Sequence, residues 1–144
     1  MTEPRRPDGY TISTDPARVD RRAVWDFLRT SYWSPGIEFE VVSRAIDNSL
    51  AFVLLGPGGE LAGFGRAVTD QVRFAWLADV FVLAGHRGSG LGVWLVQTML
   101  DHPDLRGLRI LLATADAHGL YERFGFHAVD GQRIMERPRP DPSL

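Results

Sequence analysis

Residues 80–92 are the most constraining stretch of this chain, because an apolar run ends abruptly in closely spaced glycines. The stretch is Val-Phe-Val-Leu-Ala-Gly-His-Arg-Gly-Ser-Gly-Leu-Gly, and apolar residues at helical spacing follow it. This order predicts a strand, a tight turn and a helix. Glycines at a helix start leave backbone N–H groups uncovered, and the helix N-terminus adds partial positive charge. The turn is therefore expected to hold phosphate.

Two common phosphate-binding motifs do not fit this glycine turn. A P-loop needs Gly-Lys-Ser/Thr, and no such triplet follows the glycines. In a dinucleotide-binding motif that starts at Gly88, the third required glycine falls at Val93. In addition, no acidic residue ends the strand predicted over residues 108–113 to hold a ribose.

The composition excludes several other classes of site. Absence of cysteine excludes disulfides, thiolate metal sites and a cysteine nucleophile. The histidines follow no metal-binding spacing, so no metal site is expected. A formal net charge of -2 without a long basic run speaks against nucleic-acid binding. No apolar stretch is long enough to cross a membrane and no signal region is present, so a cytoplasmic protein is expected.

Hydrophobic periodicity predicts one mixed α/β domain, which we expect to span residues 10–136. A flexible N-terminus at residues 1–9 and a flexible proline-rich tail at residues 137–144 are expected on either side. The predicted strands cover residues 10–13, 50–55, 60–69, 74–83 and 108–113. The predicted helices cover residues 20–30, 39–46, 91–100 and 117–124.

The last strands carry further expectations. The strand at residues 74–83 is mostly apolar on both faces, which favours a position near the middle of the sheet. The strand at residues 108–113 is expected to be buried, and the helix before it predicts parallel pairing with residues 74–83. A last strand is expected from Phe126 onward. The earlier strands are expected to pair antiparallel.

Two segments resemble a known family. Arg87-Gly-Ser-Gly-Leu-Gly92 resembles the Arg/Gln-x-x-Gly-x-Gly/Ala signature of the GCN5-related N-acetyltransferases (GNAT), and it follows a strand as in that family. Residues 120–126, Leu-Tyr-Glu-Arg-Phe-Gly-Phe, resemble the second conserved motif of the family. The resemblance extends from Tyr10 to about Met135. It implies a three-layer fold with a twisted mixed sheet, whose parallel strands splay apart in a wedge for acetyl-CoA.

The resemblance also implies where the donor acetyl-CoA binds. In the family, backbone amides of the glycine turn cradle the pyrophosphate, and Arg87 is expected to add a charge. The wedge is expected between residues 79–83 and 109–113, with Val80 and Val82 as backbone contacts of the pantetheine arm. The turn residues that this comparison matches are Arg87, Gly88, Ser89, Gly90, Leu91 and Gly92.

Two residues are the candidates for catalysis. Tyr121 matches the tyrosine that protonates the departing thiolate in many family members, and a phenol with a pKa around 10 remains protonated at neutral pH. The alternative for Tyr121 is simple packing on the apolar face of its helix. Asp79 is the only ionisable residue of its predicted strand. It is a general base, a substrate anchor or a structural carboxylate, and the neighbouring Ala78 occupies a position that is often acidic in the family.

The acceptor is the least constrained part of the prediction. Tyr32 and Trp33 lie on the loop that borders the acceptor site in this family and are candidates for the acceptor pocket. Trp76 is a third candidate, but for this residue we rather expect that it fills the core. We expect direct transfer of an acetyl group to the amine of a small molecule or peptide, with a non-catalytic acyl-CoA-binding or sensor module as the alternative. Homodimers are common in the family, but no residue of this sequence establishes one.

Overall fold

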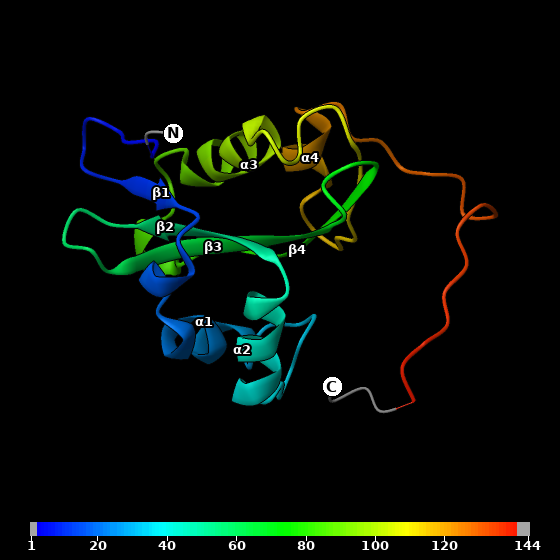
Figure 1. Ribbon diagram of the computed structural model, residues 1–144, viewed down its shortest axis with the longest axis horizontal. Coiled ribbons are helices and arrows are strands. Elements are labelled where there is room, and N and C mark those ends of the chain that lie inside the picture. The colour runs from blue at the N-terminus through cyan, green and yellow to red at the C-terminus, as the bar shows by residue number, and fades with distance from the viewer. Residues whose placement is uncertain (1–2, 141–144) are drawn as a thin grey trace.

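The computed structural model describes residues 3–140 and places helices on both faces of one sheet (Figure 1). Residues 1–2 and 141–144, which belong to the predicted flexible ends, lie outside the described residues. The strands are β1 (Thr11–Ser13), β2 (Leu50–Leu55), β3 (Leu61–Thr69), β4 (Phe74–Val82) and β5 (Arg109–Leu111). The helices are α1 (Arg21–Leu28), α2 (Phe39–Asp47), α3 (Leu91–Asp101) and α4 (His118–Glu122), with 3-10 turns η1 (Pro16–Arg18) and η2 (Ala84–His86).

The sheet order is β1-β2-β3-β4-β5, antiparallel through β4 and parallel between β4 and β5. This confirms the predicted mixed sheet. The helices α1 and α2 cover one face and α3 covers the other, as Figure 1 shows. The cap of α1 is the one the sequence predicts, because the Asp20 side chain accepts a hydrogen bond of 3.0 Å from the amide of Ala23. Within residues 3–140, no helix has the length and apolar character to cross a membrane.

A β-bulge in β4 sets the shape of the sheet at its parallel end. Phe64 pairs with Phe81 and Arg66 pairs with Ala78, so Gly65 alone opposes the two residues Asp79 and Val80. Asp79 takes a φ of 55°, in the left-handed region that few residues other than glycine adopt. A bulge bends its strand and increases the local twist.

Strands β4 and β5 separate before this bulge. Their parallel pairing covers only residues 74–76 of β4 and residues 109–111 of β5, although β4 continues to Val82. The backbone of β4 beyond Trp76 therefore has no strand beside it on this edge. The predicted splay of the parallel strands is present.

Two predictions for this end of the sheet are wrong: the burial of β5 and the presence of a last strand from Phe126 onward. The strand β5 is only three residues long, with Arg109 exposed and its other two residues half-buried. Within the described residues no strand follows Phe126, so the outer edge of β5 is unpaired. A turn interrupts this segment, because the amide of Arg133 donates to the carbonyl of Asp130 at 3.0 Å. Because no described strand covers this outer edge, β5 is less buried than its apolar run suggests.

The first half of β4 is also more exposed than its apolar sequence predicts. Trp76 is 36% exposed and Phe74 is 39% exposed, so the expected core role of Trp76 is wrong. The hydrophobic cluster beneath α1 and α2 includes Phe81 of β4 but does not extend to Trp76. The helices therefore leave one end of this sheet face open.

Candidate active site

The glycine turn has an open geometry at the start of α3. Gly88 and Gly90 have φ values of 93° and 76°, which a residue with a side chain adopts at a cost. A Cβ atom added to either residue would meet no heavy atom within 4 Å. These glycines are thus needed for backbone conformation and for open space above the turn, not for close packing within the protein.

The amides of this turn are available to a ligand. Gly90 is the N-cap of α3, and no side chain of the described residues caps the helix. Among residues 3–140, the amides of residues 88–93 donate to no protein acceptor, and the first backbone bond of the helix runs from Trp94 to Gly90 at 3.1 Å. Free amides at the N-terminus of an eleven-residue helix favour an anion.

An arginine from the N-terminal segment is held against the same turn. Arg6 donates from Nη1 to the carbonyl oxygen of Ser89 at 3.0 Å. Its guanidinium also lies 5.8 Å from the ring centroid of Tyr10 and 5.6 Å from that of Trp94, and it forms an ion pair with Asp8. No local sequence pattern reveals Arg6 as a functional candidate, because 83 positions separate it from Ser89.

The backbone of Val82 faces the open side of β4. Val82 lies opposite Gly63, and the amide of Leu83 donates to the carbonyl of Ala62 at 2.8 Å. Because successive residues direct their backbone groups to opposite edges of a strand, the N–H and C=O of Val82 point away from β3. Arg87 donates from Nε to this carbonyl at 2.9 Å, so its side chain folds back onto the end of β4.

A cavity of about 550 Å³ occupies the wedge between β4 and the chain that follows β5. The structure brings to this cavity five of the side chains predicted from the sequence, whereas Val82 and the glycine turn lie outside its lining. These five residues are Tyr32, Trp33, Asp79, Val80 and Tyr121. Trp76, Asp116 and Arg139 also line it.

Asp79 is held in this cavity by two donors. Its Oδ2 accepts from Nε of Arg66 at 2.7 Å, and its Oδ1 accepts from Nε1 of Trp33 at 3.0 Å. Only 12% of the Asp79 side chain and 19% of the Arg66 side chain are exposed, so the pair is largely shielded from water. Each carboxylate oxygen has two acceptor positions, and each uses one here. Asp79 can therefore accept another hydrogen bond from a bound molecule.

Tyr121 combines a buried ring with a free hydroxyl group. The residue is 7% exposed, and Phe126 packs edge-on against its ring with centroids 5.7 Å apart. Among residues 3–140, the hydroxyl forms no hydrogen bond with the protein, and it is not sealed from solvent. Burial, followed by the influence of Tyr32 and Asp116, raises the pKa of Tyr121 to about 12. The phenol is therefore protonated at neutral pH.

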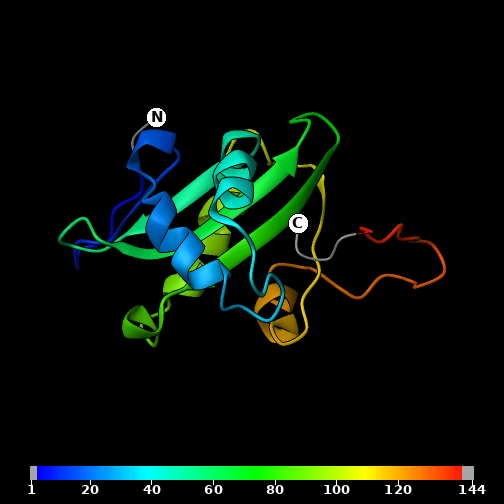
Figure 2. The same cartoon turned by 90° about the horizontal axis from the view of Figure 1, so that it is seen from below.

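The loop between α1 and α2 borders the wedge, and Figure 2 shows it at the end of the molecule where the chain passes from β5 to α4. The hydroxyl of Tyr32 donates to Oδ1 of Asp116 at 3.2 Å and accepts from the amide of Ala115 at 3.2 Å. Its neighbour Trp33 bonds to Asp79 on the opposite wall. One short loop is thus linked by hydrogen bonds to both walls of the cavity. Sequence reasoning missed Asp116, which belongs to neither of the two motifs.

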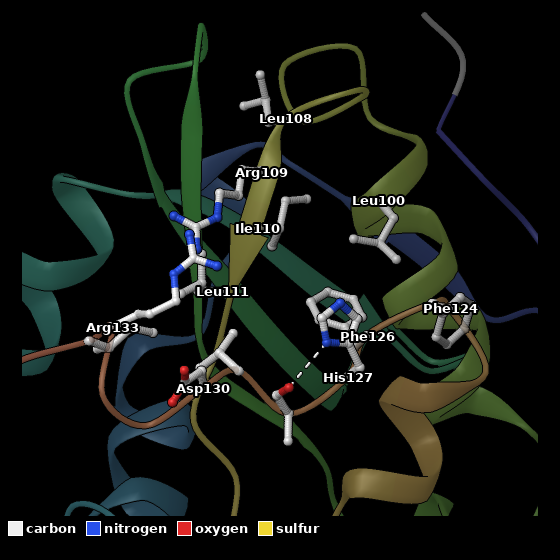
Figure 3. A pocket seen from close by; sticks show the side chains of 14 residues that line it. Leu100, Leu108, Arg109, Ile110, Leu111, Phe124, Phe126, His127, Asp130 and Arg133 are labelled. Carbon is white, nitrogen blue, oxygen red and sulfur yellow. Dashed lines mark hydrogen bonds between the residues drawn. The ribbon is translucent and has the colours of Figure 1, made fainter.

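A second cavity of about 550 Å³ lies along the unpaired edge of β5 (Figure 3). Arg109 of β5 and Arg133 of the following segment point toward one another there, and the apolar side chains of Ile110 and Phe126 lie deeper. None of the site residues predicted from the sequence lines this cavity. The candidate active site is therefore the wedge on the other side of β5.

Comparison with known proteins matches the whole arrangement to one family. The model of the acetyltransferase (GNAT) family matches residues 17–126. A Gibberella zeae protein named as an acetyltransferase is 30% identical over 135 residues, which cover 78% of this chain and 75% of that protein. The family match includes the glycine turn and the wedge residues from β4 to α4.

Solved structures of similar fold agree with these matches. A crystal structure from Xanthomonas campestris pv. campestris, described as belonging to the GNAT family, has a TM-score of 0.87 and 41% identity, and the match covers 94% of this chain and 95% of that chain. A Clostridium acetobutylicum structure solved with acetyl-CoA has a TM-score of 0.65 at 13% identity, covering 90% of this chain and 94% of that chain. At this low identity, the similarity to the C. acetobutylicum structure shows a shared fold alone.

Proposed function

This chain belongs to the GNAT family of acetyltransferases and is an acyltransferase, and on this premise we propose that it moves the acetyl group of acetyl-CoA to the amine of a small molecule. Two features together carry the proposal: a glycine turn with free amides, and a wedge whose lining includes both Tyr121 and Asp79. We assign this activity to a domain of residues 10–136.

The donor site consists of the glycine turn and the open edge of β4. The free amides of residues 88–92 suit a pyrophosphate, and the positive φ values of the glycines leave room for it. The outward-facing backbone of Val82 and the wall at Val80 suit the amide groups of a pantetheine arm. The acetyl-CoA in the C. acetobutylicum structure of similar fold supports this choice of donor.

The chemistry needs a proton acceptor and a proton donor on opposite sides of the reacting carbon. Acetyl-CoA supplies a thioester, whose C–S bond breaks as the amine nitrogen forms a C–N bond. Asp79 accepts the amine proton, directly or through water, and Tyr121 donates its phenolic proton to the departing sulfur. Solvent then returns a proton to Tyr121. Residues of the open β4 edge donate backbone N–H groups to the oxygen that gains negative charge.

The test of this function measures binding and turnover side by side. Acetyl-CoA binding is followed by calorimetry, and release of free CoA thiol is followed with a thiol-sensitive dye over a panel of amines. Binding together with amine-dependent thiol release supports the transferase. Binding without turnover on any acceptor favours the non-catalytic acyl-CoA-binding module, which the presence of Ala78 beside Asp79 supports.

Replacing Asp79 by asparagine is expected to lower kcat about 100-fold or more, because the variant loses the proton acceptor. Asparagine tolerates the left-handed backbone of this position, so the bulge is retained. Arg66→Gln is the matched control, since it breaks the same ion pair but keeps the carboxylate. Steady-state kinetics and thermal unfolding of both variants separate the roles. Equal kcat losses in both variants would assign Asp79 a purely structural role.

Replacing Arg6 by alanine is expected to weaken acetyl-CoA binding about tenfold and to leave kcat unchanged. The substitution removes the hydrogen bond to Ser89 and a positive charge next to the proposed phosphate site. The neighbouring Arg5→Ala is the control, because the Arg5 side chain makes no hydrogen bond among the described residues. Calorimetry gives both dissociation constants, and equal affinities would remove Arg6 from the donor site.

A further inference from the structure

Asp116 is a carboxylate of the wedge without an ion pair among the described residues. It lies between β5 and α4, where its Oδ1 accepts from the Tyr32 hydroxyl at 3.2 Å. Among residues 3–140 it has no ion pair, whereas Asp79 on the opposite wall is paired with Arg66. Asp116 and Tyr121 line the same cavity, and the charge of Asp116 contributes, after burial and Tyr32, to the raised pKa of Tyr121. A cationic group entering the cavity would meet this carboxylate first.

The walls around Asp116 are aromatic and partly uncovered. Tyr32 is 57% exposed, and Trp33 and Trp76 are each 36% exposed, although all three line one cavity. Covering such rings with an apolar body removes apolar surface from water, which is favourable. Aromatic faces also attract ammonium groups through their quadrupoles. The cavity therefore suits a molecule with an ammonium group and an apolar or aromatic body.

The cavity is poorly suited to an acceptor with an anionic group. Of the described residues that line it, Arg139 is the one basic side chain, and it comes from the C-terminal segment. Recognition of phosphate or carboxylate usually relies on clustered or bidentate cations. Arg66 compensates the charge of Asp79, so this single arginine stands against the carboxylate of Asp116 and three exposed rings.

Resting on the function proposed above, we propose that Asp116 is a specificity-determining residue and that the acceptor is a primary amine with an aromatic or apolar body and no anionic group. Asp116 binds the ammonium form and the rings of Tyr32, Trp33 and Trp76 cover the body. The ammonium releases one proton to solvent before the neutral amine attacks, and the second proton goes to Asp79 as the C–N bond forms and the C–S bond breaks. Each turnover therefore releases one proton overall.

A panel of three amines tests this substrate class by thiol release. 2-Phenylethylamine has the proposed features, phenylalanine adds a carboxylate to the same body, and glucosamine replaces the apolar body by a hydroxylated one. We expect kcat/KM for 2-phenylethylamine to exceed that of either competitor at least tenfold. Equal or faster turnover of phenylalanine would assign a role to Arg139, and equal turnover of glucosamine would exclude an apolar site; either result overturns the proposal.

Variants of Asp116 provide the second test. Asp116→Asn is expected to raise KM for 2-phenylethylamine about tenfold, with kcat and KM for acetyl-CoA unchanged, and Asp116→Glu is expected to restore part of the loss. Asp130→Asn, an exposed aspartate outside the wedge, is the control and is expected to behave as the unmodified protein. An unchanged KM for the amine in Asp116→Asn overturns the proposal.

Binding separates this inference from the proposed activity. Tryptophan fluorescence is titrated with 2-phenylethylamine in the presence of CoA, since Trp33 and Trp76 line the cavity. Saturable quenching that is lost in Asp116→Asn supports the amine site. This conclusion holds even if no acceptor is acetylated and the proposed transferase function fails. Absence of quenching overturns the amine site. The proposed transferase function can still stand in that case, if another acceptor is acetylated.

Discussion

Replacing Gly90 by leucine is expected to abolish measurable acetyl-CoA binding while the protein remains folded. Gly90 has a φ of 76° at the N-cap of α3, and a side chain here extends into the open space above the free amides. The added atoms occupy the position proposed for the pyrophosphate, so the loss is steric and larger than the backbone strain of about 1–2 kcal/mol. Calorimetry with acetyl-CoA and thermal unfolding measure the two effects.

Gly107→Leu is the matched control for this experiment. Gly107 has a φ of 80°, and an added Cβ would again meet no heavy atom within 4 Å. It lies between α3 and β5, away from the turn. We expect both variants to lose similar stability and only Gly90→Leu to lose binding. Unchanged affinity in Gly90→Leu, or equal affinity loss in both variants, would refute the donor site.

Replacing Tyr121 by phenylalanine is expected to lower kcat by a factor of about 100 to 10,000, the usual contribution of a general acid. The ring stays buried and, among residues 3–140, no protein hydrogen bond is lost, so the free energy of unfolding is expected to change little. KM for acetyl-CoA is expected to be unchanged. Full turnover by Tyr121→Phe would leave Tyr121 with a packing role.

The pKa of Tyr121 gives an independent check by alkaline titration. Since the folded-state pKa is about 12 and the ordinary value is near 10, Tyr121 stabilises the folded state below pH 10, and this contribution is lost as the pH rises toward 12. Ultraviolet absorbance of the wild type is expected to show a last tyrosine ionising near pH 12. That step is expected to be absent from Tyr121→Phe, and its persistence would contradict the assignment.

Local chemistry accounts for the parts of the fold that could be predicted from the sequence. Asp20 can cap α1 because an N-cap depends on nearby residues, and Gly90 can be placed at the start of α3 for the same reason. The order of β4, α3 and β5 leads to parallel pairing because crossovers have a preferred hand. The strand, turn and helix around the glycines are local in this sense and could be anticipated.

Features that depend on pairing across the chain could not be predicted in this way. The bulge at Asp79 exists because Gly65, fourteen positions earlier, opposes two residues. The exposure of Trp76 depends on how far α1 and α2 extend over the sheet, which periodicity within β4 cannot reveal. The same holds for β5, whose apolar residues suggest burial although no strand among the described residues pairs with its outer edge.

Under the proposed function, the loop that is bonded to both walls of the wedge links the binding of the two substrates thermodynamically. On the inference drawn above, an amine that binds Asp116 shares this carboxylate with the hydroxyl of Tyr32, whose neighbour Trp33 donates to Asp79 on the opposite wall. Occupancy of one half of the wedge therefore changes the free energy of the loop that borders the other half. Such coupling is reciprocal: whatever factor the donor applies to the affinity for the acceptor, the acceptor applies to the affinity for the donor.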